Sequence, residues 1–266
     1  MSVLDKFALT DKVAIITGAG KGIGAEIARV FASAGADVVL AARTESDLEA
    51  VAAEVKALGR RALTIVTDVM EFDQLQVLAE KTIAEFGRID ILVNNAGGAP
   101  PKPMSHSSAK EFEAAFRFNV STAFELSRIC APLMAESGGD GAILNISSVA
   151  GQYPAPCFAS YGTAKAGLSF LTKELAQEYA PKIRVNAIAV GSTKTDALNS
   201  ILNEEIEKTM VDLTPMARLG EVEDIAMGAL YLCSPAASYV TGDVLGVNGG
   251  LERLNMPMPR AFGGMG

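Results

Sequence analysis

The sequence predicts one α/β domain, built on a doubly wound parallel sheet with helices on both faces. Three observations indicate this fold class. Short apolar runs rich in β-branched residues recur along the chain, and amphipathic segments of helix length separate them. A length of 266 residues with 49% hydrophobic composition suits one large core. Uninterrupted apolar runs are typical of strands that helices cover on both faces.

Seven runs are expected to form the strands, in the order in which they occur. They are residues 13–16, 38–41, 62–66, 89–93, 142–146, 183–189 and 244–247. The clearest helices are expected over residues 46–58, 72–86 and 223–233. In the first of these, Leu48, Val51 and Val55 recur at helical spacing, with charged residues between them. This alternation predicts βαβ units with right-handed crossovers.

Charge and composition exclude several classes of function. The net charge is −8, from 23 basic and 31 acidic residues, so no basic surface for nucleic acid is expected. His106 is the one histidine, and the three cysteines form no CxxC pair, so we expect neither a metal site nor disulfides. Acid–base chemistry would then use a group other than imidazole. With no secretory signal and no membrane-length apolar run, the expected location is the cytoplasm.

A glycine-rich loop follows the first expected strand and precedes a helix expected from about Ala25. Glycines at such a turn let the backbone approach a pyrophosphate, and the helix N-terminus offers N–H groups and a favourable dipole to it. The loop therefore predicts dinucleotide binding. Its candidate binding residues are Gly18, Gly20, Lys21, Gly22, Ile23 and Gly24.

Further motifs give the chain a family resemblance. Asn94-Asn95-Ala96-Gly97 follows the fourth strand, Asn119 lies on the next helix, and Ser148 follows the fifth strand. Tyr161-Gly162-Thr163-Ala164-Lys165 then opens a helix. With the T-G-x-x-x-G-x-G loop, these motifs make residues 8–250 resemble the short-chain dehydrogenase/reductase family of the single-domain type.

The resemblance implies an architecture and an assembly. The expected fold is a Rossmann-type sheet of seven parallel strands in the order 3-2-1-4-5-6-7. Residues 1–250 would form the catalytic domain, with a substrate lid at about 192–215. The tail, 251–266, is expected to be disordered or to lie at a subunit interface. A homotetramer is implied, built on the helices that end near 128–136 and 168–179, with the last strand forming another interface.

Tyr161 and Lys165 are the expected centre of catalysis. They lie four residues apart, on one face of a helix. A nearby ammonium is expected to lower the pKa of the Tyr161 phenol, so that it serves as general acid and base. Ser148, rather than its neighbour Ser147, would donate to the substrate oxygen that gains negative charge. The resemblance implies that Lys165 also holds the nicotinamide ribose and that Asn119 anchors a proton-relaying water.

The second strand indicates the cofactor. An acidic residue at its end would bind a ribose 2′-hydroxyl, but Ala42 stands there, followed by Arg43. Arg43 and Lys21 favour a 2′-phosphate, so we expect NADP(H) over NAD(H). The resemblance implies further cofactor contacts, with a usual proline replaced by Val190. They are Thr44, Asp68, Val69, Asn95, Ala96, Gly97, Tyr161, Lys165, Gly191, Thr193 and Thr195.

The substrate side is expected to be apolar. Its candidate residues are Ser148, Gln152, Tyr153, Phe158, Tyr161, Leu198 and Leu202. The stretches 195–198 and 214–238 are similar to bacterial 7α-hydroxysteroid dehydrogenase, whose C-terminal half in turn resembles that of 3-oxoacyl-carrier-protein reductases. The expected function is reversible hydride transfer between NADP(H) and a secondary alcohol or ketone, steroid-like or cyclic. A 3-oxoacyl thioester reductase and a non-catalytic cofactor sensor remain alternatives, although the net charge does not favour docking of an acidic carrier protein.

Overall fold

The computed structural model describes residues 2–261 as a sheet of seven parallel strands in the order β3-β2-β1-β4-β5-β6-β7. The predicted fold class and strand order are therefore confirmed. The strands are β1 Val13–Thr17, β2 Asp37–Ala42, β3 Ala62–Val66, β4 Ile91–Asn94, β5 Gly141–Ser148, β6 Ile183–Val190 and β7 Val244–Val247. The main helices are α1 Gly22–Ser33, α2 Glu45–Ala57, α3 Phe72–Phe86, α4 Ala109–Phe116, α5 Thr122–Ser137, α6 Ala159–Tyr179 and α9 Val222–Cys233.

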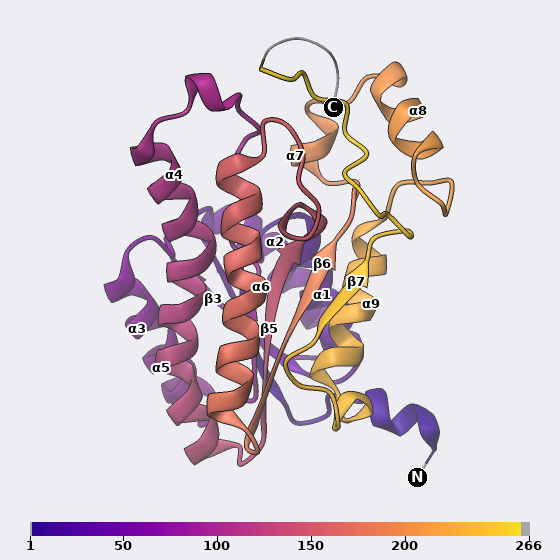
Figure 1. The fold of residues 1–266 in the computed structure, drawn as a ribbon. Helices are drawn as coiled ribbons and strands as arrows, with labels where there is room; N and C mark the ends of the chain where they lie inside the picture. Colours follow the sequence, from indigo (N-terminus) through magenta and orange to yellow (C-terminus); the bar gives the residue numbers. More distant parts are fainter. Residues whose placement is uncertain (1, 262–266) are drawn as a thin grey trace.

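Helices cover both faces of the sheet, because side chains alternate along each buried strand (Figure 1). Ile16 of β1 packs in one core, with Phe31 of α1 and residues of α2 and α9. Its neighbour Ile15 packs in the opposite core, with Leu75 of α3 and residues of α5 and α6. Each strand therefore needs apolar residues at successive positions, which explains the uninterrupted runs in the sequence.

The first helix and the lid show details beyond the expectation. Helix α1 begins at Gly22, before Ala25, because the last glycines of the loop already form its first turn. The expected lid contains two short helices, α7 Asp196–Asn199 and α8 Glu204–Asp212. Asn203 starts the second by accepting a hydrogen bond from the N–H of Ile206 at 2.8 Å. Among residues 2–261, no helix combines the length and apolarity that crossing a bilayer needs.

In the described part of the C-terminal tail, residues 251–261, Asn255 attaches the tail to its own chain, and a place for the tail at a subunit interface stays a prediction. Asn255 is buried, with 2% of its surface exposed. Its side chain accepts from Ser192 Oγ at 2.5 Å and donates to Met210 O at 3.0 Å and Thr214 Oγ1 at 2.9 Å. The tail passes α7 and α8 above the carboxyl ends of the strands (Figure 1). Residues 262–266 lie outside the described part.

Candidate active site

Three elements bring the four expected catalytic residues to the carboxyl edge of the sheet. Ser148 is the last residue of β5, and Tyr161 and Lys165 lie in the first two turns of α6. Asn119 lies in a π-helical segment, Arg117–Ser121, between α4 and α5. Such π-turns are rare and often occur at functional sites. The sequence predicted a helix around Asn119 but not this irregular winding.

Ser148 and its neighbour Ser147 have different surroundings, because β5 directs them to opposite sides. Ser148 is 9% exposed, and its Oγ accepts from the N–H of Ala150 at 3.1 Å. Its interaction with the Tyr161 side chain lowers the pKa of that phenol. Ser147 faces α6, where its hydroxyl donates to the carbonyl of Lys165 at 3.0 Å. Ser148 is thus the serine paired with the tyrosine.

Lys165 carries a buried ammonium in the first turns of α6. Its exposure is 4%, and its Nζ donates to Ile146 O at 2.7 Å. Burial penalises the charged form and lowers the pKa of Lys165 to about 8. The same Nζ lies 5.7 Å from the centroid of the Tyr161 ring.

The pKa of Tyr161 differs from expectation. Burial raises the pKa of the phenol, and the interaction with Ser148 opposes this effect. The expected lowering by Lys165 is therefore wrong for the chain as described. The Lys165 Nζ lies 5.7 Å from the ring centroid and donates to Ile146 O, and the effect of burial on the phenol outweighs the attraction from this ammonium.

Asn119 and Lys165 both lie close to Gly97, in the segment that follows β4. Its side chain donates to Gly98 O at 3.0 Å and to Ala115 O at 2.8 Å, and it accepts from the N–H of Gly98 at 2.9 Å. A Cβ on Gly97 would lie 2.7 Å from Asn119 Oδ1 and 3.2 Å from Lys165 Nζ. Only glycine allows this approach, which joins the segment after β4 to the catalytic residues.

The glycine loop faces the segment that follows β6. Gly18 and Gly22 have φ angles of +64° and +55°, a region that favours glycine. A Cβ on Gly22 would lie 3.7 Å from Thr195 Cγ2, so the two segments meet at the sheet edge. Thr195 also caps α7, and Thr193 is buried, with its hydroxyl donating to Gly191 O at 3.2 Å.

The loop after β4 is tied to the loop after β1. Thr17 Oγ1 accepts from the N–H of Asn95 at 3.0 Å and of Ala96 at 3.1 Å. The Asn95 side chain in turn donates to Thr17 O at 2.9 Å and Gly18 O at 3.2 Å. The expected cofactor residues that follow β1 and β4 therefore lie side by side.

The ends of β2 and β3 supply the remaining expected cofactor residues. Arg43 and Thr44 are exposed, and Arg43 has no ion-pair partner in the chain from residue 2 to residue 261. Thr44 is the N-cap of α2 without a capping side-chain bond. Asp68 accepts from the N–H of Met70 at 2.9 Å, and Val69 is buried.

The expected substrate residues are only partly brought together. The rings of Phe158 and Tyr161 lie 6.3 Å apart between centroids. Tyr153, Leu198 and Leu202 are half-buried, whereas Gln152 is exposed. Contact of these side chains with a substrate stays a prediction. Asn255, which bonds to the lid segment, is not among the expected site residues, because nothing in the Met- and Pro-rich tail indicates that it is buried.

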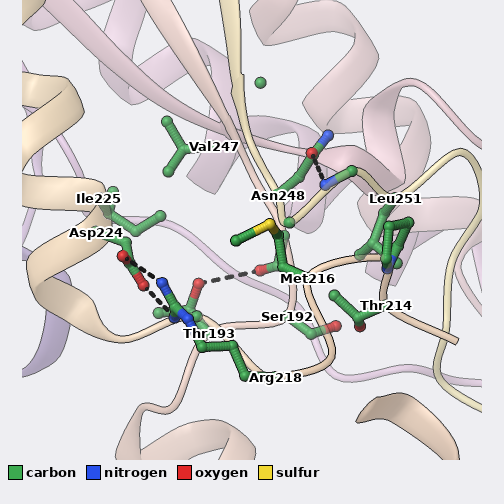
Figure 2. A pocket seen from close by; sticks show the side chains of 16 residues that line it. Ser192, Thr193, Thr214, Met216, Arg218, Asp224, Ile225, Val247, Asn248 and Leu251 are labelled. Atoms are coloured by element: carbon green, nitrogen blue, oxygen red, sulfur yellow. Dashed lines mark hydrogen bonds and ion pairs between the residues drawn. The ribbon is translucent and has the colours of Figure 1, made fainter. Parts of the chain in front are cut away.

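A cavity of about 380 Å³ lies beside the segment that follows β6 (Figure 2). Its walls come from residues 191–193, from the segment between α8 and α9, and from the end of β7. Arg218 and Asp224 pair on one side, and Asn248 accepts from the N–H of Gly250 on another (Figure 2). Neither Ser148 nor Tyr161 lines this cavity.

Comparisons with known proteins agree with this arrangement. A family model described as enoyl-(acyl carrier protein) reductase, one of the short-chain dehydrogenase/reductase models, matches residues 18–252. The chain is 45% identical to 7α-hydroxysteroid dehydrogenase of Escherichia coli, over 94% of this chain and 98% of that one. It is 35% identical to a 3-oxoacyl-[acyl-carrier-protein] reductase of Thermotoga maritima, over 91% and 98%.

A solved structure is also similar to this chain in both fold and sequence. It is a 7α-hydroxysteroid dehydrogenase complexed with NADH and 7-oxo glycochenodeoxycholic acid, with a TM-score of 0.91 and 44% identity. The match covers 94% of this chain and 98% of that one. The family model, the relatives and the solved structure all indicate the same family. The chain belongs to the short-chain dehydrogenase/reductase family and is a short-chain alcohol dehydrogenase.

Proposed function

We propose that this dehydrogenase transfers hydride reversibly between NADP(H) and a secondary alcohol or ketone that is apolar or cyclic. The observation that carries the proposal is the placement of Ser148 and Tyr161 next to each other, with the buried Lys165 Nζ 5.7 Å from the centroid of the Tyr161 ring. Ser148 would donate to the carbonyl oxygen, and Tyr161 would give its proton to that oxygen in reduction or take it in oxidation. The nicotinamide, when bound, supplies or accepts the hydride.

The residues at the sheet edge fit a nicotinamide dinucleotide. The loop before α1 and Thr195 face each other, as two sides of a diphosphate site would. Lys165 would hold the nicotinamide ribose through its buried ammonium, and Asp68 would accept from the adenine amine. In this role Asn119 would anchor a water that passes protons between Lys165 and solvent.

Preference for NADP(H) rests on residues around the end of β2. Ala42 offers no carboxylate to a ribose 2′-hydroxyl, and the exposed guanidinium of Arg43 is free of ion pairs within residues 2–261. The related solved structure contains NADH. The preference is therefore argued from this chain's own residues.

The substrate class is argued from the apolar side chains near the site. Phe158 packs near Tyr161, and the lid contributes the half-buried Leu198 and Leu202. These surroundings suit a ring system such as a hydroxysteroid. The relative from Thermotoga maritima supports a second candidate, reduction of a 3-oxoacyl thioester.

A substrate screen tests the function. Hydroxysteroids, cyclic ketones and acetoacetyl thioester would be supplied with each nicotinamide cofactor, and NADPH or NADH absorbance recorded. We expect turnover of a cyclic or steroid substrate, with kcat/KM higher for NADP(H). A clear preference for NADH would contradict the proposed NADP(H) preference. A clear preference for the thioester would contradict the proposed substrate class. No turnover with any compound would favour the non-catalytic sensor.

We also propose a homotetramer that uses α5, α6 and β7. Large apolar side chains are exposed on this side of the molecule, including Phe116 at 39%, Phe124 at 44% and Phe170 at 62%. Light scattering after size-exclusion chromatography tests the assembly. A monomer at micromolar concentration would contradict it.

A further inference from the structure

An ion pair joins the glycine loop to the first turn of α2. Lys21 Nζ lies 3.2 Å from Asp47 Oδ2, and the Asp47 side chain is 25% exposed. The two segments touch at Gly20, where a Cβ would lie 3.0 Å from Asp47 Cβ and 3.7 Å from Ala42 Cβ. Asp47 is thus packed against the loop that carries one of the two cations expected to select the cofactor.

Asp47 does not act as a helix cap. It stands three residues after Thr44, the N-cap of α2, where an acidic side chain closes a capping box by accepting from the N-cap N–H. In residues 2–261 no such bond forms at Thr44, and the carboxylate is directed to Lys21. The Asp47 carboxylate therefore pairs with Lys21 in place of capping the helix, in a first turn where the helix dipole also favours a negative charge.

The two cations near the end of β2 differ in what they contact. Arg43 is exposed and has no ion-pair partner across the described chain, residues 2–261, whereas Lys21 is already paired with a carboxylate. A 2′-phosphate would compete with the Asp47 carboxylate for Lys21. A neutral 2′-hydroxyl would leave the ion pair intact.

We propose that Asp47 lowers the affinity of this enzyme for NADP(H) relative to its affinity for NAD(H). It acts by holding Lys21 in an ion pair that a 2′-phosphate must disrupt. Asp47 is then a specificity-determining residue whose negative charge weakens binding of the phosphorylated dinucleotide and leaves binding of NAD(H) unchanged. The inference rests on the proposed nicotinamide cofactor, but it concerns a residue outside the expected binding set.

Calorimetric binding measurements test the proposal without turnover. The ligands are NADP⁺, NAD⁺ and adenosine 2′,5′-bisphosphate, and the variant is Asp47→Asn. Glu45→Gln is the matched control, because Glu45 lies in the same first turn, is exposed and has no ion-pair partner in the described residues. Thermal melting shows whether each variant is folded.

The expected result is specific to Asp47 and to the 2′-phosphate. Asp47→Asn should bind NADP⁺ and the bisphosphate about fivefold more tightly, the effect of one partly exposed charge. Binding of NAD⁺ should change less than about twofold, as should all binding by Glu45→Gln. An unchanged or weaker relative affinity for NADP⁺ in Asp47→Asn would overturn the proposal. An equal gain in Glu45→Gln would overturn it too.

A second background separates the pairing from direct repulsion. In Lys21→Gln, the gain from Asp47→Asn should largely disappear, and a gain that persists would overturn the assigned action through Lys21. The outcome is also distinguishable from that of the proposed function. If the unaltered enzyme binds NAD⁺ more tightly than NADP⁺, the proposed preference fails, whereas the shift in the ratio on Asp47→Asn still decides the role of Asp47.

Discussion

The buried ammonium of Lys165 should make folding stability depend on pH in a defined window. Its pKa falls from 10.5 to about 8 because of burial, so between these values the unfolded chain binds more protons than the folded one. The free energy of unfolding therefore rises with pH through this window, and the penalty of the buried charge is full below about pH 8. Integrating the two pKa values gives a gain of about 2 kcal/mol between pH 7 and pH 9.5.

Lys165→Met removes this titration while keeping much of the side-chain volume. Denaturant unfolding of both proteins, without cofactor and at constant ionic strength, gives their difference in stability at each pH. The lost hydrogen bond to Ile146 O adds an amount to this difference that does not vary with pH, so the test is how the difference in stability changes with pH. Titration of the buried Cys130, whose pKa is raised to about 12, cancels in the difference. A difference that stays constant between pH 7 and pH 9.5 would refute the reasoning.

Two further substitutions test the contacts around the site. Gly97→Ala places a methyl 2.7 Å from Asn119 Oδ1, so the buried Asn119 must shift. We expect kcat to fall by about tenfold or more, as small misplacements of catalytic groups can do, and the melting temperature to fall as well. Unchanged kcat would show that Asn119 and Lys165 tolerate displacement. Asn255→Ala leaves Thr214 and Met210 O without their tail partner and should cost about 2 kcal/mol of stability while raising KM for the substrate. Proteolysis at residues 192–215 measures the loosened lid, and protection equal to that of the original chain would contradict this role.

The fold was predictable because its signals are local. Each strand carries successive apolar residues, since Ile15 and Ile16 pack into opposite cores. Glycines and polar motifs follow the strands in an order that places them at one edge. The strand order came from the family resemblance, because periodicity alone does not choose which strands pair.

What the sequence could not predict depends on contacts between distant segments. The pKa of Tyr161 was expected to fall because Lys165 lies one turn away, yet spacing does not show where an ammonium is directed or how deeply a phenol is buried. Asn255 and Asp47 were missed for the same reason. Each is an ordinary polar residue whose partners lie elsewhere in the chain, Thr214 and Lys21 respectively.

The central claim is that Tyr161 moves the substrate proton, and Tyr161→Phe tests it most directly. The variant keeps the ring beside Phe158 and Lys165 but lacks the hydroxyl that would exchange the proton. With the best substrate from the screen, kcat should fall by about a hundredfold or more, the usual contribution of a general acid–base group, while the Kd of NADPH changes by less than about twofold. Turnover within tenfold of the original enzyme, with NADPH still bound, would contradict the assigned role.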